Sequence, residues 1–296
     1  MKAAWIATFS GVLLAAGCAD DDGAEGESEA EAEAEAEAEA EAEAEAEAEA
    51  ESESESESES EGECEPAPGG DWTCLGSVPA WPLPTTTTGT YSVTITDFVT
   101  GNAMDGVAVK ACAADDVDCS DPYDTQTTDG EGAVSMTLPF GDVGFDGYLE
   151  MTGGNAKSTL VFFNPPLVNP AFEGTLKGFT EDSFNLFATV SGVTIDDTRG
   201  GLGVVAEDCT NMAAPGVVLA TDAADEDSTL VYIEADFPSA EACATDESGA
   251  GGFFNLIPGD AVSVETWVDD AMVGSATVVI RAGTFTAVVL PPNPSK

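Results

Sequence analysis

A glutamate stands at every odd position from Glu25 to Glu65, separated mainly by alanine and then by serine. Such a repeat offers no apolar face at helical spacing, and its like charges fall on every side of a helix. High charge without large apolar residues favours a disordered, self-repelling chain. Residues 18–71 are therefore predicted to form a tether, whose repeat would span roughly 35 to 40 Å as a flexible coil. Its expected role is to hold a folded part away from a membrane.

The acidity of the chain is not confined to this tract. The whole sequence has 57 acidic and 7 basic residues, which gives a formal net charge of −50. Nucleic acid would be repelled by such a surface, so no nucleic-acid partner is expected. The absence of histidine excludes Ser–His and Cys–His nucleophile pairs as well as metal sites with imidazole ligands.

An apolar stretch at residues 3–16 precedes Cys18. A short basic start, an apolar run and small residues before a cleavage point are typical of a secretory signal, here residues 1–17. The segment Leu14-Ala-Ala-Gly-Cys18 resembles a bacterial lipoprotein signal, which implies that Cys18 is lipidated and becomes the mature N-terminus. Ala15 stands where that motif usually carries leucine, and a plain secretory signal is the alternative.

The same resemblance predicts an exported protein that is lipid-anchored at the outer membrane or the cell surface. Ala19 follows the lipidated position in place of the aspartate that resembles an inner-membrane retention signal in enteric lipoproteins. Asp20 to Asp22 resemble acidic surface-export signals.

The seven cysteines are an odd number, and lipidation of Cys18 would leave six for disulfides in an oxidising compartment. A zinc site is the competing use, but the chain has no close Cys-x-x-Cys spacing and no histidine. Six cysteines allow many connectivities, and pairing in sequence order is the simplest. The expected pairs are Cys64–Cys74, Cys112–Cys119 and Cys209–Cys243.

From Trp72 onward the sequence has the composition of a secreted β protein. Residues 72–89, rich in proline and tryptophan, are predicted to form a rigid neck, and the segment after it alternates apolar and polar residues at the period of a half-buried strand. Glycine and aspartate separate further β-rich segments. The expected strands are 91–98, 107–112, 133–138, 147–152, 158–163, 203–207, 215–219, 230–235, 252–256, 261–268, 273–280 and 285–290.

One short helix is expected between the two β-rich halves of the folded part. Thr180 precedes an amphipathic run that contains Phe184 and Phe187, and Gly192 follows as a stop. A threonine cap and a terminal glycine are the usual helix boundaries. We expect this helix to pack against a neighbouring sheet.

An internal repeat divides the β-rich region. The segment Thr128-Asp-Gly-Glu-Gly132 matches Thr245-Asp-Glu-Ser-Gly249, and each follows a Gly-Val pair, at Gly106 and at Gly216. A tandem duplication accounts for this order. The motif resembles the carboxypeptidase regulatory-like domain, and the resemblance implies a transthyretin-like, Ig-like β-sandwich with seven strands. Thr-Asp-x-x-Gly is also a common turn sequence that other β-sandwiches share.

The predicted fold is thus all-β, with two tandem seven-stranded-type β-sandwiches that are joined by a short helix and preceded by a disordered acidic tether. The expected boundaries are 90–168 for the first sandwich, 169–199 for a linker with the helix, and 200–291 for the second sandwich.

Acidic loops offer the one candidate metal site, and otherwise no cofactor is expected. Carboxylate oxygens on a short loop are ligands that Ca²⁺ accepts, although neither loop follows EF-hand order. A solvated acidic loop is the alternative. The candidate ligands are Asp115, Asp116, Asp118 and Asp121 in one half, and Asp222, Asp225, Glu226 and Asp227 in the other.

Carbohydrate binding through an exposed aromatic ring is the second candidate. Trp267, next to two aspartates at a turn, is the ring that we single out, while most other aromatics lie on expected strands and should pack in the core.

Together these features predict a non-catalytic envelope protein with a structural, adhesive or carbohydrate-binding role, and with a membrane, a glycan or an envelope protein as partner. The alternative is an accessory subunit of a secreted peptidase or other hydrolase. An intrinsic hydrolase that uses two carboxylates is the third class.

Overall fold

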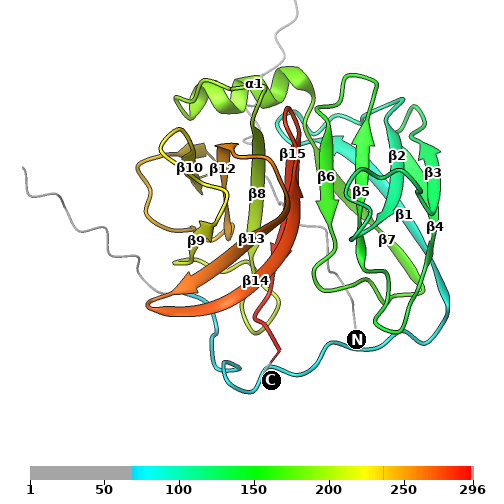
Figure 1. Cartoon of the computed structure of the whole chain (residues 1–296), viewed down its shortest axis with the longest axis horizontal. Coiled ribbons are helices and arrows are strands. Elements are labelled where there is room, and N and C mark those ends of the chain that lie inside the picture. The colour runs from blue at the N-terminus through cyan, green and yellow to red at the C-terminus, as the bar shows by residue number, and fades with distance from the viewer. Residues whose placement is uncertain (1–68, 236, 295–296) are drawn as a thin grey trace, which may run out of the picture. The chain divides into compact units, whose positions relative to one another are not determined.

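Alternation of buried and outward-facing side chains along β1 (Thr88–Asp97) shows how the sequence builds this fold. A computed structural model describes residues 69–235 and 237–294, and in it Tyr91, Val93 and Ile95 are buried while their neighbours are more exposed. Successive side chains of a strand point to opposite faces, so a period-two pattern commits one face to the core. The described residues form fifteen strands and one helix (Figure 1), which confirms the all-β prediction.

The first half of the fold is a sandwich of two sheets. In one sheet, β1 lies between β4, which runs antiparallel to it, and β7, which runs parallel. In the other, the order is β3-β2-β5-β6. The core between them takes large side chains from both sheets, among them Tyr91, Met136 and Leu149. The strand bounds are Ala108–Ala113 (β2), Asp124–Thr127 (β3), Ala133–Pro139 (β4), Gly147–Thr152 (β5), Thr159–Phe162 (β6) and Ala171–Gly178 (β7).

The second half repeats this plan. Strand β8 lies between antiparallel β12 and parallel β15, as β1 lies between β4 and β7. A facing sheet has the order β14-β13-β9. One strand differs, because β10 pairs with β12, whereas its counterpart β3 pairs with β2. The bounds are Gly200–Ala206 (β8), Val218–Thr221 (β9), Thr229–Glu234 (β10), Phe237–Ser239 (β11), Ala250–Leu256 (β12), Gly259–Val268 (β13), Ala271–Ile280 (β14) and Phe285–Leu290 (β15).

The two halves share one sheet. Strand β15 pairs in parallel with β6 of the first half, with Phe285 opposite Thr159. The result is a nine-stranded sheet of order β11-β10-β12-β8-β15-β6-β5-β2-β3, and Figure 1 shows β15 beside β6 at its centre. One hydrophobic cluster accordingly mixes residues of both halves, such as Tyr148 and Leu202.

The helix α1 (Glu181–Val190) forms where the sequence predicts it. Thr180 is its N-cap, with its hydroxyl accepting a hydrogen bond from the backbone N–H of Ser183, and the two residues form a capping box. Phe184 and Ala188 are buried against an aromatic cluster that includes Phe254 of the second half and Phe179 at the end of the first. In Figure 1 the helix lies across one end of the second half and reaches the junction with the first half near β6. It therefore reinforces the junction that β15 and β6 make.

Three strands lie outside the expected ones: β3, β7 and β11. The most consequential is β7, because residues 169–199 were expected to be a linker and β7 completes the first sandwich. Phe172 and Leu176 face the core, but Gly174 between them interrupts the apolar pattern of that face and weakens its strand signal.

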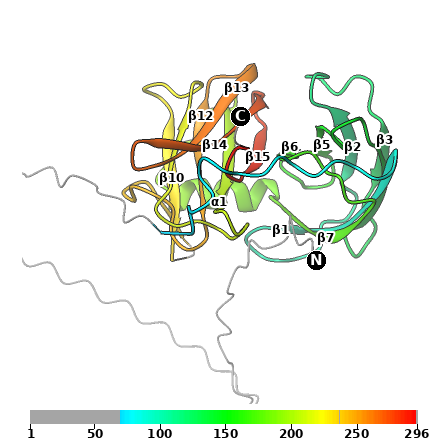
Figure 2. The same ribbon diagram turned by 90° about the horizontal axis from the view of Figure 1, so that it is seen from below.

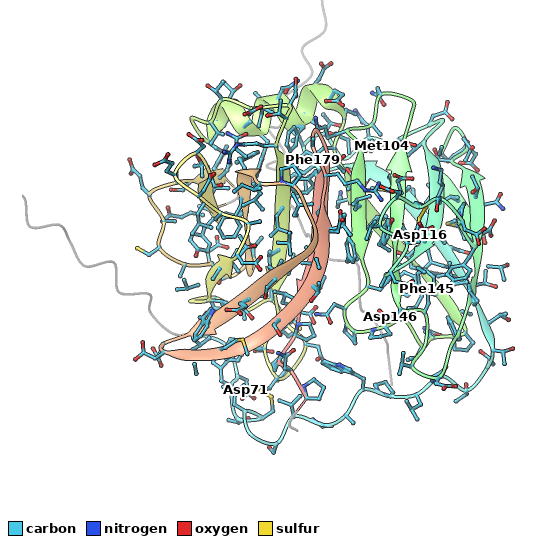
Figure 3. The ribbon with its side chains drawn as sticks, in the orientation of Figure 1. Asp71, Met104, Asp116, Phe145, Asp146 and Phe179 are labelled. Carbon is cyan, nitrogen blue, oxygen red and sulfur yellow. A yellow bond between two sulfur atoms is a disulfide. The ribbon has the colours of Figure 1, made fainter. Side chains whose placement is uncertain are left out.

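The neck crosses the base of both halves before it enters β1, as Figure 2 shows from below. The residue just before the neck is fixed to the second half: the backbone N–H of Asp71 donates to Asp208 Oδ2 over 2.8 Å, and the N–H of Cys209 donates to the carbonyl of Asp71 over 2.9 Å. Asp71 lies at that base in Figure 3. Cys18, Cys64 and nearly all of the predicted tether lie outside the described residues. Within the described residues, no helix is long and apolar enough to cross a membrane.

Candidate functional site

The repeated Thr-Asp-x-x-Gly motif forms the same turn twice. In the first half the hydroxyl of Thr128 donates to the carbonyl of Met104 over 2.7 Å and accepts from the N–H of Val107 over 2.9 Å. In the second half Thr245 makes the equivalent bonds to Ala214 and Val217 at the same two distances. Each threonine is buried. The motif therefore ties two loops together, and its role in this chain is structural.

The glycine that ends each motif is required by space as well as by conformation. Gly132 has φ 75° and Gly249 has φ 63°, both in the left-handed region that favours glycine. A Cβ at Gly132 would lie 2.5 Å from the carbonyl oxygen of Ile95, and one at Gly249 would lie 2.5 Å from that of Ala206. These contacts explain why the repeat keeps glycine at this position.

The acidic loop of the first half is closed by hydrogen bonds of its own. The Asp116 carboxylate accepts the backbone N–H groups of Asp121 and Ser120, over 2.9 and 3.0 Å, which lowers the pKa of Asp116. Asp115 and Asp118 are exposed. Asp116 thus serves as the internal acceptor of the loop (Figure 3).

This loop also clamps the two halves together. The backbone carbonyl of Val117 accepts the Nε–H of Arg281, at the end of β14, over 3.0 Å and also an Nη2–H of the same guanidinium. Nη2 also donates to the hydroxyl of Tyr148 over 2.8 Å, and the other arm of Arg281, Nη1, pairs with buried Glu150 on β5 over 2.5 Å. Lys110 pairs with the second oxygen of Glu150 over 2.9 Å.

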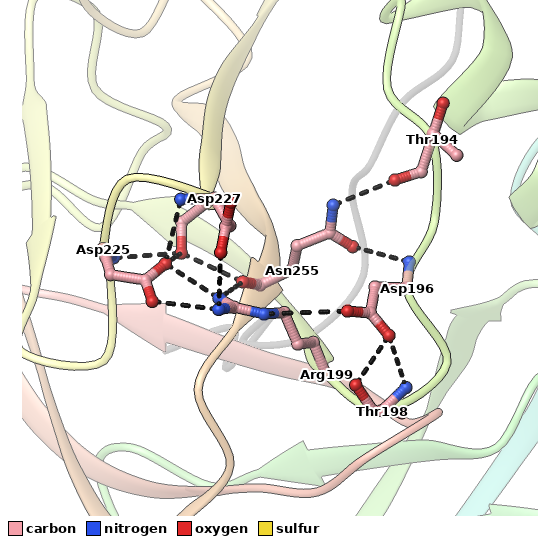
Figure 4. Close-up of polar contacts among 8 residues, drawn as sticks. Thr194, Asp196, Thr198, Arg199, Asp225, Asp227 and Asn255 are labelled. Carbon is pink, nitrogen blue, oxygen red and sulfur yellow. Dashed lines mark hydrogen bonds and ion pairs between the residues drawn. The ribbon is translucent and has the colours of Figure 1, made fainter.

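Arg199 binds two of the carboxylates in the acidic loop of the second half (Figure 4). The guanidinium donates to both carboxylate oxygens of Asp225, over 2.7 and 3.0 Å, and to Asp227 over 3.0 Å. The bond from Arg199 is the main reason why the pKa of Asp225 falls to about 2. Asp222 accepts instead the backbone N–H of Ser263 over 2.9 Å.

In the described part of the chain, no three acidic or cysteine side chains are grouped so that they could hold a metal ion. Asp116 and Asp225 are oriented by the partners named above. Ca²⁺ binding by the acidic loops stays a prediction.

Trp267 lies on β13 with its ring on the face opposite the core. Thr266 and Val268 are buried, whereas Trp267 and Glu265 lie on the other face, where the indole N–H donates to the Glu265 carboxylate over 3.1 Å. Most other aromatics are buried, as expected, but Phe237 is 64% exposed on the edge strand β11. The ring of Trp267 and the adjacent carboxylate form a small amphipathic platform.

The cysteines pair differently from the sequence-order prediction. Cys112 bonds to Cys119 as expected, closing the acidic loop of the first half. The expected partners of Cys74 and Cys209 were wrong, because these two cysteines bond to each other across 135 residues of sequence. Cys243 is also disulfide-bonded. The Cys74–Cys209 bond fastens the neck to the second half, a long-range contact that spacing could not reveal.

Among the described residues, one carboxyl oxygen is buried without a hydrogen bond. Glu207 follows β8, and its Oε2 has no partner among the described residues. Burial, with a smaller contribution from the neighbouring Asp208 charge, raises the pKa of Glu207 to about 7. A lone carboxyl without a nearby nucleophile or second carboxylate arranged for catalysis does not make an active site.

A cavity of about 380 Å³ lies between the neck and the two halves. Four separate segments line it: neck residues 78–82, the β6–β7 loop at 162–169, residues 208–211 after β8, and residues 289–292 at the end of β15. Sequence analysis missed this site because its walls meet only in the folded chain. It also missed Arg199 and Arg281, although basic residues this rare in an acidic chain are a usable signal.

Comparisons with known proteins add little to this geometry. No family model matches the chain, and no curated protein matches it. Among solved structures, the shaft pilin SpaA from Lactobacillus rhamnosus GG is 14% identical with a TM-score of 0.24, over 70% of this chain and 98% of that one. The Bacillus anthracis TIE protein is 13% identical with a TM-score of 0.25, over 70% of this chain and 34% of that one. BcpA, the major pilin subunit of Bacillus cereus, is 11% identical with a TM-score of 0.23, over 69% of each chain. At such TM-scores the likeness carries no argument about this chain.

Proposed function

We propose that this chain is a non-catalytic, lipid-anchored protein of the outer membrane or cell surface. Residues 1–17 act as the signal, Cys18 carries the lipid, and the acidic tract holds two sandwiches of the carboxypeptidase regulatory-like type away from the membrane. The observation that carries the proposal is the fastening of residues 69–74 to the base of the second half by a disulfide and by backbone hydrogen bonds. This fastening makes the residues that follow the acidic tract part of the folded body, so the tract would attach at the base of the second half.

The specific role that we favour is adhesion through carbohydrate. The support is Trp267, whose ring lies on the outward face of β13 beside the Glu265 carboxylate. An aromatic ring can stack on the apolar C–H face of a sugar ring, while a polar group beside it can bind the sugar hydroxyls. The outward position is the one that a docking ring requires.

A glycan array probed with the mature protein and with Trp267→Ala tests this role. We expect the wild-type protein to bind one or more glycans and the variant Trp267→Ala to lose this binding. Trp81→Ala, a change on the neck, is the control and should keep it. Absence of glycan binding by the wild-type protein would remove the carbohydrate role. Stoichiometric co-purification with a secreted peptidase would favour the accessory-subunit alternative instead.

A further inference from the structure

The cavity under the neck has the features of a small-molecule site. Its volume of about 380 Å³ falls within the usual size of ligand pockets, which often form where separate parts of a protein meet. Here the neck forms one wall, and segments of both halves form the others. In Figure 2 the neck passes under both halves, so a ligand in this cavity would contact all three parts.

The walls are apolar and rigid. Trp81 projects from the neck, and Val289 and Leu167 contribute aliphatic surface. Proline fixes its own backbone φ, so a wall built from it loses little freedom when a ligand binds. The neck wall is also held in place by the Cys74–Cys209 bond. The prolines in the walls are Pro79, Pro82, Pro165, Pro166, Pro291 and Pro292.

The charges at the cavity exclude ionic ligands. Among the described residues no lysine or arginine lines it, so an anion would meet only a chain of net charge −50. Asp208 is the one carboxylate that the described residues place in the walls. Its Oδ2 accepts the N–H of Asp71, and its Oδ1 accepts the hydroxyl and N–H of Thr210 and the N–H of Met212. With both oxygens engaged, the carboxylate has little capacity left to bind a cation.

The remaining polar groups in the walls are neutral amides. Asn164 donates its side-chain N–H to the carbonyl of Val289 over 3.1 Å, which directs its amide and leaves the amide oxygen as an acceptor. Asn169 and Asn211 add two more amide side chains. A few neutral hydrogen-bonding groups among apolar walls fix the orientation of an uncharged ligand.

We propose that this cavity binds an uncharged, mainly apolar small molecule that stacks a flat or aliphatic face on Trp81. The site is separate from the Trp267 platform, because Trp81 lies on the neck and Trp267 lies on β13. The proposal therefore goes beyond the adhesive role and does not depend on it.

The test is a fluorescence titration of the mature full chain with two dyes that share a naphthylamine ring system. N-phenyl-1-naphthylamine is uncharged, and 8-anilinonaphthalene-1-sulfonate carries a sulfonate. We expect the neutral dye to bind and the sulfonate to bind at least about tenfold more weakly. Trp81→Ala should weaken neutral-dye binding by about tenfold, because it removes the stacking wall. Trp267→Ala is the matched tryptophan control and should leave the affinity unchanged.

A second variant, Val168→Lys, places a charge in the wall without touching the neck, and it should also weaken neutral-dye binding. Circular dichroism confirms that each variant is folded. Absence of neutral-dye binding at the highest soluble protein concentration would overturn the proposal. Equal binding by Trp81→Ala and wild type, or equal loss in Trp81→Ala and Trp267→Ala, would overturn it as well. Tighter binding of the sulfonate would contradict the argument from charge.

Discussion

At the scale of single residues, the two buried threonines of the repeat show how a short motif is kept in both halves. Thr128 and Thr245 each bridge a loop carbonyl and the N–H of the residue just before a strand, at matching distances. A buried N–H that loses its partner keeps the full cost of its desolvation. The hydroxyl group, more than the size of the side chain, therefore explains why both halves have threonine at this position.

We therefore expect Thr128→Val and Thr245→Val each to lower the free energy of unfolding by about 1 to 3 kcal/mol. Urea denaturation followed by tryptophan fluorescence measures the change. Thr125→Val on the exposed edge strand β3 is the control and should have a much smaller effect. Equal effects at Thr125 and Thr245 would show that the bridging bonds do not matter.

Glu207 makes the stability of the folded protein depend on pH. Burial raises its folded-state pKa from 4.5 to about 7, so the folded protein binds this proton more tightly than the unfolded chain does. Below the unfolded pKa both states are protonated, and no stability is lost. As pH rises from about 4.5 to 7 the carboxyl ionises in a buried place, and stability falls.

The predicted size of this loss is at most about 3 kcal/mol, reached above pH 7. Glu207→Gln should remove it, so the variant gains stability relative to wild type at pH 8 and shows little difference at pH 4.5. Thermal unfolding of both proteins across this range measures the difference, and the subtraction cancels the repulsion among the other acids. A constant difference at all pH values would rule out the titration of Glu207 as the cause.

At the scale of elements, local patterns predict strands well but their partners poorly. Strands β5 and β15 begin and end at the predicted residues, because short runs rich in apolar and aromatic residues between glycine-containing turns carry a strong local signal. The helix α1 is equally local, since its cap lies within one turn. The pairing of β15 with β6 and the bond between Cys74 and Cys209 join residues far apart in sequence, which no local period specifies.

The junction between the halves depends on Arg281, and we expect Arg281→Met to destabilise the protein by about 3 kcal/mol. The change leaves buried Glu150 with Lys110 as its remaining ion-pair partner and frees the carbonyl of Val117. Differential scanning calorimetry measures the loss. The double variant Arg281→Met with Glu150→Gln should recover part of it, because it removes the buried carboxylate that lost one of its two cationic partners. No recovery in the double variant would assign the loss to packing instead.

At the scale of the whole molecule, the neck and the two halves form one body that is joined by several long-range contacts. The nine-stranded sheet, the helix α1 and the Arg281 clamp each join the two halves, and the Cys74–Cys209 bond joins the neck to the second half. The predicted two-sandwich plan anticipates the layers, but not the shared sheet or the cavity beneath it. Trp267 could be singled out from its neighbours in sequence, whereas the Trp81 cavity could not.

We propose that this body is held at the cell envelope by a lipid on Cys18. The direct measurement is incorporation of a fatty-acid label into the protein expressed in a bacterial host, compared between wild type and Cys18→Ala, with both proteins followed by membrane fractionation. We predict that wild type takes up the label and sediments with membranes, and that Cys18→Ala does neither. An unlabelled wild-type protein, or a Cys18→Ala protein that keeps both label and membrane attachment, would contradict the account.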